Sequence, residues 1–442
     1  RHASPLERRH SLKTDRLLVP IVIVQALLGI RVIWRMVRSA GGERITADHF
    51  RSASGAEGRP QGIAPTMDDA ARDAIDWIPT PIKERVSVIV PVLNERNRLS
   101  SCLEGLIAQG AEVHEILVVD GGSNDGTQEL VCTYAQRDPR MRLVDASPVP
   151  TNCNGKAWGM QVGLCSASPG SDWILTVDAD VRPRALLTSA LLAHAKRAKL
   201  TALSVATLQE IESLGEGLLH PSLLTTIVYR FGMPGKVARR VSEVQANGQC
   251  FLFSRGALES CGGFLGTFNS ICEDVTIART LVAAGYPVGF YEAGDLVTVK
   301  MYADWRDTWR NWTRSLPMHD RFSDIYTLIG WLEVVLVQAL PLPLVLFLII
   351  SRLGNRGRRQ GAINRDVVSA RRQRSWPMML NSILLALRIG VLFGTARAYQ
   401  RRPWSYWLSP LCDLPVAVQL VRSMLQRRHI WRGRVLVRGE MS

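Results

Sequence analysis

The sequence lacks any C-x-x-C pair, although it contains eight cysteines. These are Cys102, Cys132, Cys153, Cys165, Cys250, Cys261, Cys272 and Cys412. An even number of cysteines would suit a disulfide framework in a secreted chain. The apolar surroundings of these residues favour reduced, buried thiols in a reducing compartment instead. A small-residue cleavage site is also missing after the first apolar run, so we expect that run to be kept as an anchor.

Acidic residues are fewer than basic ones, with 39 Asp and Glu against 54 Lys and Arg, for a net charge of +15. Basic chains bind polyanions, so nucleic acid is one class of partner to weigh. The arginines, however, stand beside apolar runs, as at Arg31, Arg35 and Arg38 and again from 352 to 374. Arginines in such places meet anionic lipid headgroups. We therefore expect a membrane partner and no nucleic acid.

The N-terminal region predicts an anchor over residues 1–38, followed by a polar linker over 39–84. The first apolar run, Leu17 to Val37, is uninterrupted only as far as Ile30, which is short for a membrane span. Arg31 and Arg35 can extend the run by directing their charged ends to the interface. The linker has little apolar periodicity and predicts at most a short helix near 67–77.

Residues 85–300 predict one α/β domain with a mostly parallel sheet and helices on both faces. Four β-branched or apolar runs predict strands, at 86–93, from 115 into a turn that ends at 127, at 141–146 and at 172–180. Helical spacing of leucines separates the first two, and Thr127 or Asp125 is available to cap the next helix. Ligands of such sheets bind at the carboxyl ends of the strands, where Asp120, Asp178 and Asp180 lie.

The C-terminal third predicts membrane-associated helices. Trp305, Trp309 and Trp312 form a stripe beside a stripe of arginines, which favours an interfacial helix over 301–322, with a core helix as the alternative. Membrane or re-entrant segments are predicted over 323–424, in three apolar runs at 325–350, 378–396 and 404–424. Pro341 and Pro343 should kink the first run.

The charges of the C-terminal third lead to two further expectations. The basic loop 352–374 and a basic tail at 425–442 are expected on the cytoplasmic side. Glu333 and Arg388 stand inside apolar runs, where lone charges are costly, so we expect them to be neighbours.

Carboxylates supply the candidate chemistry. Asp178 and Asp180 follow the apolar run "WILTV", and alternate strand residues share a face, so together they can bind a hard divalent cation. Asp120 leads into "GGSNDGT", where it serves either a ligand or a simple turn. Glu273 and Asp274 begin a helical pattern, where they either stabilise the helix end or supply a general base. An aspartate base needs neighbours that raise its pKa.

These motifs, taken together, resemble family 2 glycosyltransferases. The segments are "VSVIVPVLNE", "ILVVDGGSNDGT", "NGKAWGMQVG", "ILTVDADVRP", "GQCFLFSRGALESCGGF" and "CEDVTIARTLVAAGY". The resemblance spans about 85–314 and implies the nucleotide-sugar transferase fold called type A, with inversion at the anomeric carbon.

The resemblance also implies roles for particular residues. Asp274 would be the base and Asp180 the ligand of Mg²⁺ or Mn²⁺. The donor, a UDP-sugar first of all, would meet Pro91, Glu95, Asp120, Lys156 and Asp178. The acceptor side would include Glu273 and Asn247, Gly248 and Gln249.

The C-terminal region resembles bacterial membrane enzymes that glycosylate carotenoids and other terpenoid lipids. The chain lacks the Gln/Arg-x-x-Arg-Trp motif that processive synthases and ceramide glucosyltransferases carry after the base, which speaks against a processive synthase. Arg310 and Arg314 either clamp the donor diphosphate or face lipid headgroups. The alternatives are a transferase for polyprenyl phosphate, sterol or ceramide, and a catalytically inactive, lipid-bound scaffold that binds nucleotide-sugars or partner enzymes. The catalytic domain is expected to face the cytoplasm.

Overall fold

The computed structural model describes residues 5–47, 83–151, 153–270, 272–302, 304–315, 324–356, 375–426, 428–431 and 434–437. The chain forms two compact units. One comprises residues 1–41, 211–233 and 302–427, and the other comprises residues 42–210, 234–301 and 428–442. Most of the predicted linker, the predicted helix near 67–77 and most of the basic loop 352–374 lie outside the described residues.

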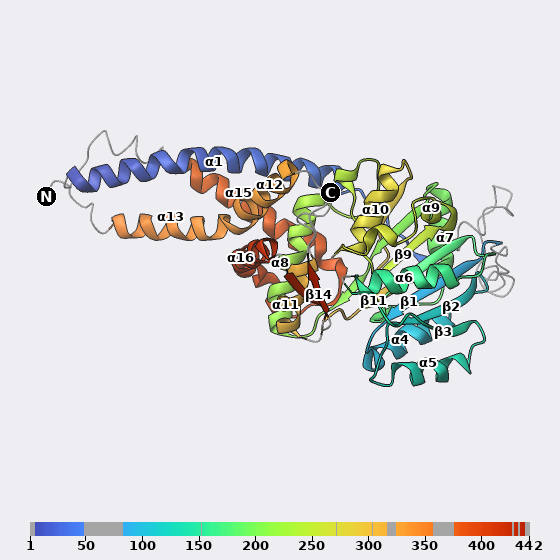
Figure 1. The fold of residues 1–442 in the computed structure, drawn as a ribbon. Coiled ribbons are helices and arrows are strands. Elements are labelled where there is room, and N and C mark those ends of the chain that lie inside the picture. Colours follow the sequence, from blue (N-terminus) through green and yellow to red (C-terminus); the bar gives the residue numbers. More distant parts are fainter. Residues whose placement is uncertain are drawn as a thin grey trace, which may run out of the picture. The chain divides into compact units, whose positions relative to one another are not determined.

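The second unit is built on an eight-stranded sheet in the order β3-β2-β1-β4-β9-β6-β10-β8 (Figure 1). The pairs β1–β2, β1–β4, β2–β3 and β6–β10 are parallel, and β9 runs antiparallel to both of its neighbours. The strands of this sheet are β1 Val86–Val92, β2 Val113–Asp120, β3 Met141–Asp145, β4 Trp173–Val177, β6 Ala202–Ala206, β8 Lys236–Ala238, β9 Cys250–Ser254 and β10 Val288–Glu292. The predicted fold class, an α/β sheet that is mostly parallel, is confirmed.

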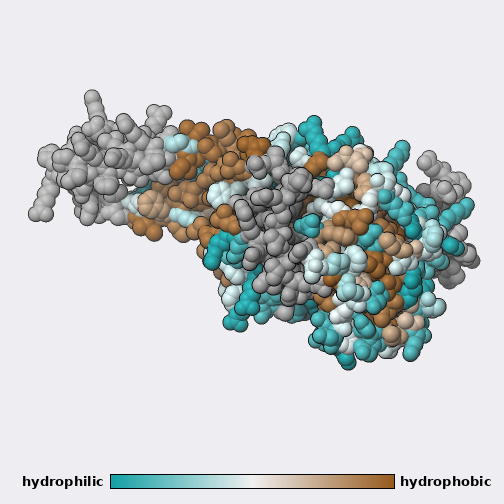
Figure 2. All heavy atoms as spheres, viewed as in Figure 1, coloured by the Kyte–Doolittle hydropathy of each residue, from teal (hydrophilic) through white to brown (hydrophobic). Residues whose placement is uncertain are grey.

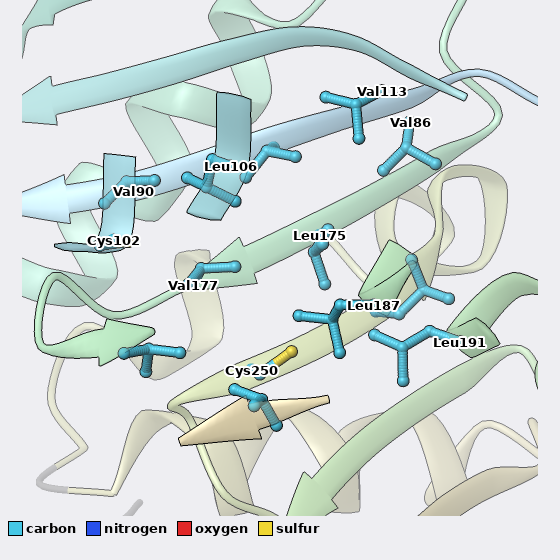
Figure 3. Packing of buried hydrophobic residues seen from close by; sticks show 14 of the residues in the cluster. Val86, Val90, Cys102, Leu106, Val113, Leu175, Val177, Leu187, Leu191 and Cys250 are labelled. Atoms are coloured by element: carbon cyan, nitrogen blue, oxygen red, sulfur yellow. The ribbon is translucent and has the colours of Figure 1, made fainter. Parts of the chain in front are cut away.

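Helices cover both faces of this sheet because its strands are apolar on both sides. Alternate β1 residues point to opposite faces: Val88 and Val90 join one core cluster, and Ile89 joins another. The first cluster packs against α4, α5 and α7, and Figure 3 shows part of it, including Val90, Leu175 and Leu187. The second packs against α6, α9 and α10. The helices are α4 Arg96–Ile107, α5 Thr127–Ala135, α6 Gly155–Ser166, α7 Leu187–Arg197, α9 Arg255–Ser260 and α10 Glu273–Ala283.

Smaller elements complete this unit. Strand β11 (Val297–Val299) pairs with β5 (Val181–Pro183) and with β7 (Leu208–Glu210). Two short 3-10 turns, η1 and η2, span Val241–Glu243 and Leu265–Thr267. Near the C-terminus, β13 (Arg428–Trp431) and β14 (Arg434–Val437) form an antiparallel hairpin.

The first unit is helical. Its elements are α1 Pro5–Ser39, α8 Leu214–Phe231, α11 Trp305–Ser315, α12 Asp324–Leu332, the π-helical η3 Glu333–Ala339, α13 Pro341–Arg356, α15 Ser375–Thr395, η4 Ala396–Ala398, β12 Tyr399–Arg401, η5 Trp404–Cys412 and α16 Asp413–Leu425. The kink predicted at Pro341 is confirmed, because the segments on its two sides meet at 42°. The third apolar run, 404–424, is a 3-10 stretch followed by a helix.

Two helices are long and apolar enough to cross a membrane by length and composition: Pro20–Ser39 within α1, and Trp376–Ala398, which runs from α15 into η4. The bent pair Ile325–Ala339 and Pro341–Leu353 would add a third if it acts as one span. Exposed apolar side chains gather over α1, α13 and α15 (Figure 2). Exposed apolar patches mark surfaces that bind a protein partner or a membrane.

Glu333 and Arg388, which we expected to be neighbours, each form an ion pair with a different residue. Glu333 binds Arg31 at 2.9 Å and Arg35 at 3.0 Å, both from α1. Arg388 binds Asp413 at 2.8 Å and also donates to Ser409. Both charges are paired, as the cost of burial requires, but the partners come from helices that sequence spacing could not identify.

The tryptophans of α11 differ in how far they are exposed at the surface. Trp305 is 44% exposed, whereas Trp312 is 7% exposed and packs in a cluster with Leu219, Val334 and Val416. The expectation that all three indoles face a membrane interface is therefore corrected for Trp312, because protein contacts cover it.

Candidate active site

The candidate site lies in the second unit, at the carboxyl ends of β1, β2 and β4. In the order β3-β2-β1-β4, the chain proceeds from β1 to β2 and β3 on one side and then returns to β4 on the other side of β1. Such a reversal of strand order is where α/β sheets place their ligands. Pro91 is half-buried on β1, and Glu95 is the buried residue that precedes α4. Asp178 and Asp180 occupy the turn after β4, where the Val181 amide donates to the Asp178 carbonyl.

Lys156 connects acidic residues of two segments with a backbone carbonyl of a third. Its Nζ lies 2.7 Å from Asp178 Oδ1 and 2.9 Å from Glu273 Oε1, and it donates to the Gly248 carbonyl at 3.4 Å. Burial by itself would lower the pKa of Lys156, but Asp178, Glu273 and Asp274 together raise it well above its usual range. The lysine therefore stays charged and holds β4, α6 and α10 around one centre.

Asp274 lies at the start of α10, one residue from Glu273. Its Oδ2 accepts a hydrogen bond from the Gly248 amide at 2.7 Å, and its Oδ1 accepts one from the amide of Val275 at 2.8 Å. Burial and the charge of Glu273 raise the pKa of Asp274 to about 7, against the lowering influence of Lys156. A carboxylate with such a pKa accepts protons more readily near neutral pH than an ordinary aspartate does.

Gly248 is a glycine because its neighbours leave no space for a side chain. A Cβ at this position would lie 2.8 Å from Lys156 Nζ and 3.2 Å from Asp274 Cβ. The backbone of Gly248 thus approaches both charged side chains at once. Asn247 and Gln249, on its two sides, are joined by a hydrogen bond from Asn247 Nδ2 to Gln249 Oε1 at 2.9 Å.

Asp180 has the properties of a cation ligand. Its Oδ1 is buried and has no hydrogen-bond partner among the residues that the structure describes. Burial first, and then the charge of Asp178, raise the pKa of Asp180 to about 7, while Arg98 lowers it. Within the described ranges no group of three or more His, Cys, Asp or Glu side chains could hold a metal ion by itself. One or two carboxylates are nevertheless the usual protein share of a Mg²⁺ site that substrate phosphates complete, so the donor set fits a hard divalent ion.

Asp120 is fully buried and its carboxylate is used by the turn that follows β2. The amides of Gly122 and Ser123, the hydroxyl of Ser123 and the side-chain amide of Gln128 all donate to it. The Ser123 hydroxyl also accepts from the Asn94 amide at 2.8 Å, which links this turn to the segment of Glu95. The structure therefore gives Asp120 a part in shaping the turn, and its contact with a nucleoside stays a prediction.

Three further residues belong to the site but were not identified from the sequence. Asn154 caps α6 and donates to Glu273 Oε2 at 3.2 Å, so one side chain orients both the helix and the carboxylate. Arg98 lies 2.9 Å from Glu95 Oε2. Thr207 donates to Gln249 Oε1 at 2.5 Å. Asn154 could have been found as a helix cap before "GKAW". Neither Arg98 nor Thr207 carries a local signal.

Two predicted donor-binding residues lie in the other unit. Arg310 is exposed on α11. Arg314 is also in α11, and its side chain lies outside the described residues. A role for either at the diphosphate stays a prediction.

The family comparison concerns this region of the chain. Residues 87–262 match the family described as Glycosyl transferase family 2. Glycosyltransferase GlyG of Streptococcus pneumoniae is 30% identical over 99 residues, which cover 22% of this chain and 31% of that protein. The dolichyl-phosphate beta-glucosyltransferase of Trichomonas vaginalis is 36% identical over 109 residues, which cover 23% of this chain and 31% of that protein. The chain thus spans about a third of the length of these relatives.

Among solved structures, a mannosyltransferase from Pyrobaculum calidifontis in complex with GDP-Man and Mn²⁺ aligns with 92% of this chain and 99% of its own. The TM-score is 0.44 and the sequence identity is 18%.

Proposed function

Because residues 87–262 match the family described as Glycosyl transferase family 2, we propose that the protein transfers a sugar from a nucleotide diphosphate donor, with inversion, to a hydroxyl group of a membrane lipid. The observation that carries this proposal is the cluster around Lys156, which gathers Asp178, Glu273 and Asp274 beside the buried, unpaired oxygen of Asp180. Such a cluster offers separate groups for a donor diphosphate and for an attacking hydroxyl.

The donor end of the site is assigned to Asp180, with Asp178 beside it. These carboxylates would hold Mg²⁺ or Mn²⁺, which neutralises the charge that develops on the departing diphosphate. Asp178 keeps its orientation because Lys156 binds its Oδ1 at 2.7 Å and because the Gln249 carbonyl accepts from its amide at 3.0 Å. UDP-sugars are our first choice of donor, with Pro91, Glu95 and Asp120 expected near the nucleoside.

The acceptor end is assigned to Asp274. The acceptor hydroxyl oxygen forms a bond to the anomeric carbon while the bond from that carbon to the diphosphate oxygen breaks. The proton of the hydroxyl passes to the Asp274 carboxylate, and the bonding electrons leave with the diphosphate. Hydrogen bonds from the amides of Gly248 and Val275 hold Asp274 in one orientation, so it need not reorganise during the reaction.

A lipid acceptor is supported by the two helices that are apolar enough to cross a membrane. A hydroxyl of a carotenoid or another terpenoid is our first proposal for the acceptor, and the cytoplasm is our proposal for the compartment that the site faces. A polyprenyl phosphate is the second candidate, because one relative carries the name of a dolichyl-phosphate glucosyltransferase.

The two acceptors make different demands on Asp274. A hydroxyl must lose a proton, whereas a phosphate monoester, whose second pKa is about 6, is already ionised at neutral pH. Replacement of Asp274 by Asn should therefore nearly abolish transfer to a hydroxyl but should spare much of the transfer to a phosphate.

The test is a screen of the full-length protein in detergent against UDP-glucose, UDP-galactose, UDP-N-acetylglucosamine and GDP-mannose, with and without Mn²⁺. A true donor should raise the melting temperature by mass action. Radiolabelled sugar from that donor is then offered to extracted membrane lipids, and chromatography separates terpenoid glycosides from polyprenyl-phosphate sugars. Stabilisation by a nucleotide sugar without any transfer from it would favour the inactive scaffold, and absence of both would contradict the proposed function.

A further inference from the structure

A buried side-chain amide lies next to the residue that contacts Asp274. Gln249 is 3% exposed and directly precedes β9. Its backbone carbonyl accepts from the Asp178 amide at 3.0 Å, and its backbone amide donates to Asn247 Oδ1 at 3.2 Å. Gln249 is therefore attached both to the acidic turn after β4 and to the loop that carries Gly248.

Neighbouring side chains fix the orientation of this amide. Gln249 Oε1 accepts from the Thr207 hydroxyl at 2.5 Å and from Asn247 Nδ2 at 2.9 Å. Gln209 Nε2 donates to the Thr207 oxygen at 2.8 Å, so the hydroxyl hydrogen of Thr207 is left to point at Gln249. With both acceptor positions of Oε1 occupied, the amide cannot turn over without losing two hydrogen bonds.

The nitrogen end of the amide is the unsatisfied one. Gln249 Nε2 is buried and has no hydrogen-bond partner in the described part of the chain. A buried donor without an acceptor is costly, so a position of this kind calls for an oxygen from outside the chain. Asp180 Oδ1 is the corresponding unsatisfied acceptor, at the end of β4, which pairs with β9.

The proposed reaction limits what that oxygen can be. The diphosphate belongs at Asp180 and the attacking hydroxyl at Asp274, so the transferred sugar must lie between them. Gln249 borders both ends, through its contact with Asp178 and through its neighbour Gly248. We infer that Gln249 Nε2 donates a hydrogen bond to one hydroxyl oxygen of the transferred sugar and so selects the donor, with Thr207 as the residue that positions it.

This inference rests on the proposed sugar transfer and names the group that recognises the sugar. A site built to bind a hydroxyl discriminates against an analogue that lacks it, because the donor in the site is then left unpaired. The loss should be confined to the hydroxyl that accepts from Nε2, since the nitrogen of a locked amide reaches only one small region of the sugar.

The experiment measures kcat/KM for the donor that the wild-type protein uses and for its 2-, 3-, 4- and 6-deoxy analogues. For wild type, one analogue should lose about tenfold more than the others, the usual size of one hydrogen bond. Gln249→Met should lose a similar factor with the parent sugar and should show no further loss with that one analogue. Thr207→Val should reduce the same discrimination partially, while the penalties for the other analogues stay unchanged.

Gln109→Met is the matched control. Gln109 is also buried, but its amide is fully used by Gly105, Arg184 and Thr188. This variant should lose thermal stability and keep the discrimination among deoxy sugars. Equal penalties for all analogues in Gln249→Met and in wild type would overturn the inference, and would indicate that a structural water satisfies Nε2. Absence of transfer by the wild-type protein from every nucleotide sugar would overturn the proposed function as well.

Discussion

Buried charges are arranged differently in the two units. In the helical unit, Arg388 meets Asp413 in a two-pronged pair whose side chains are 2% and 3% exposed, and Ser222 and Gln338 donate further hydrogen bonds to Asp413. In the sheet unit, Lys156 alone faces the carboxylates Asp178, Glu273 and Asp274, with Asp180 nearby.

This difference separates a structural ion pair from a site. The charges of this pair balance each other, although Arg388 Nη1 has no hydrogen-bond partner among the described residues, so the pair needs no ion from outside the protein. Its role is to join helices. Burying more carboxylates than cations destabilises the fold, and the raised pKa values reflect this cost. Binding of a cation or a proton removes it. The same physical rule thus predicts opposite behaviour when the charges of the two units are changed.

The largest effect is expected for Asp274→Asn. Loss of a general base typically lowers turnover by about 10²–10⁴-fold. The fold should survive, because the amide can still accept from Gly248 and because one surplus negative charge is removed. Turnover of a hydroxyl acceptor and donor-induced thermal shift are the two measurements. Near-normal turnover with a preserved donor shift would remove Asp274 from the role.

Breaking the balanced pair should instead damage the fold. Arg388→Met leaves Asp413 buried without its cation, and such changes cost about 3–5 kcal/mol of the free energy of unfolding. Thermal unfolding in detergent measures the loss. The double variant Arg388→Met/Asp413→Leu is the control and should recover most of it, because no lone charge then remains. An undamaged single variant would show that the pair is dispensable.

Removing a charge from the cluster of Glu333 with Arg31 and Arg35 should lower the stability of the fold less than removing Arg388 does. Glu333→Gln keeps the shape and some hydrogen bonding but removes the charge, and the Arg31 side chain is 46% exposed, so Arg31 depends less on its partner than the buried Arg388 does. We expect a loss of roughly 1–3 kcal/mol, the cost of a weakened hydrogen bond to a buried charged group. A loss as large as that of Arg388→Met would contradict this ranking.

The smallest expected effect concerns pH. The pKa of Asp274 is raised to about 7, so kcat/KM for a hydroxyl acceptor should rise with pH and level off above about 7. Stability has the opposite sign: a carboxyl group whose pKa is raised in the folded state stabilises the fold at low pH, and this contribution is lost as pH rises through about 7. Glu273→Gln should move the rate inflection to lower pH, since the charge of Glu273 raises the pKa of Asp274. An unmoved inflection would assign it to another group.

Local patterns in the sequence were sufficient to predict many of the strands and acidic residues of the sheet unit. The runs that predicted strands at 86–93 and 141–146 correspond to β1 and β3. In β1, residues buried on both faces leave a continuous apolar signal, whereas β3 is an edge strand that is partly exposed. The acidic residues at strand ends were identified for the same reason. Asp178 and Asp180 follow the apolar part of β4 directly, so their placement is a local matter.

Contacts between distant residues were decided by tertiary structure alone. Glu333 and Arg31 are 302 positions apart, and Gln249 and Thr207 are 42 apart. No periodicity encodes such partners, since a helix or strand repeats over a few residues and says nothing about which other segment packs against it. The sequence by itself determined which elements form and where the carboxylates stand. Only the fold decided that one lysine would pair with two of them and that the buried Nε2 of Gln249 would have no partner among the described residues, because burial and pairing depend on how the elements pack.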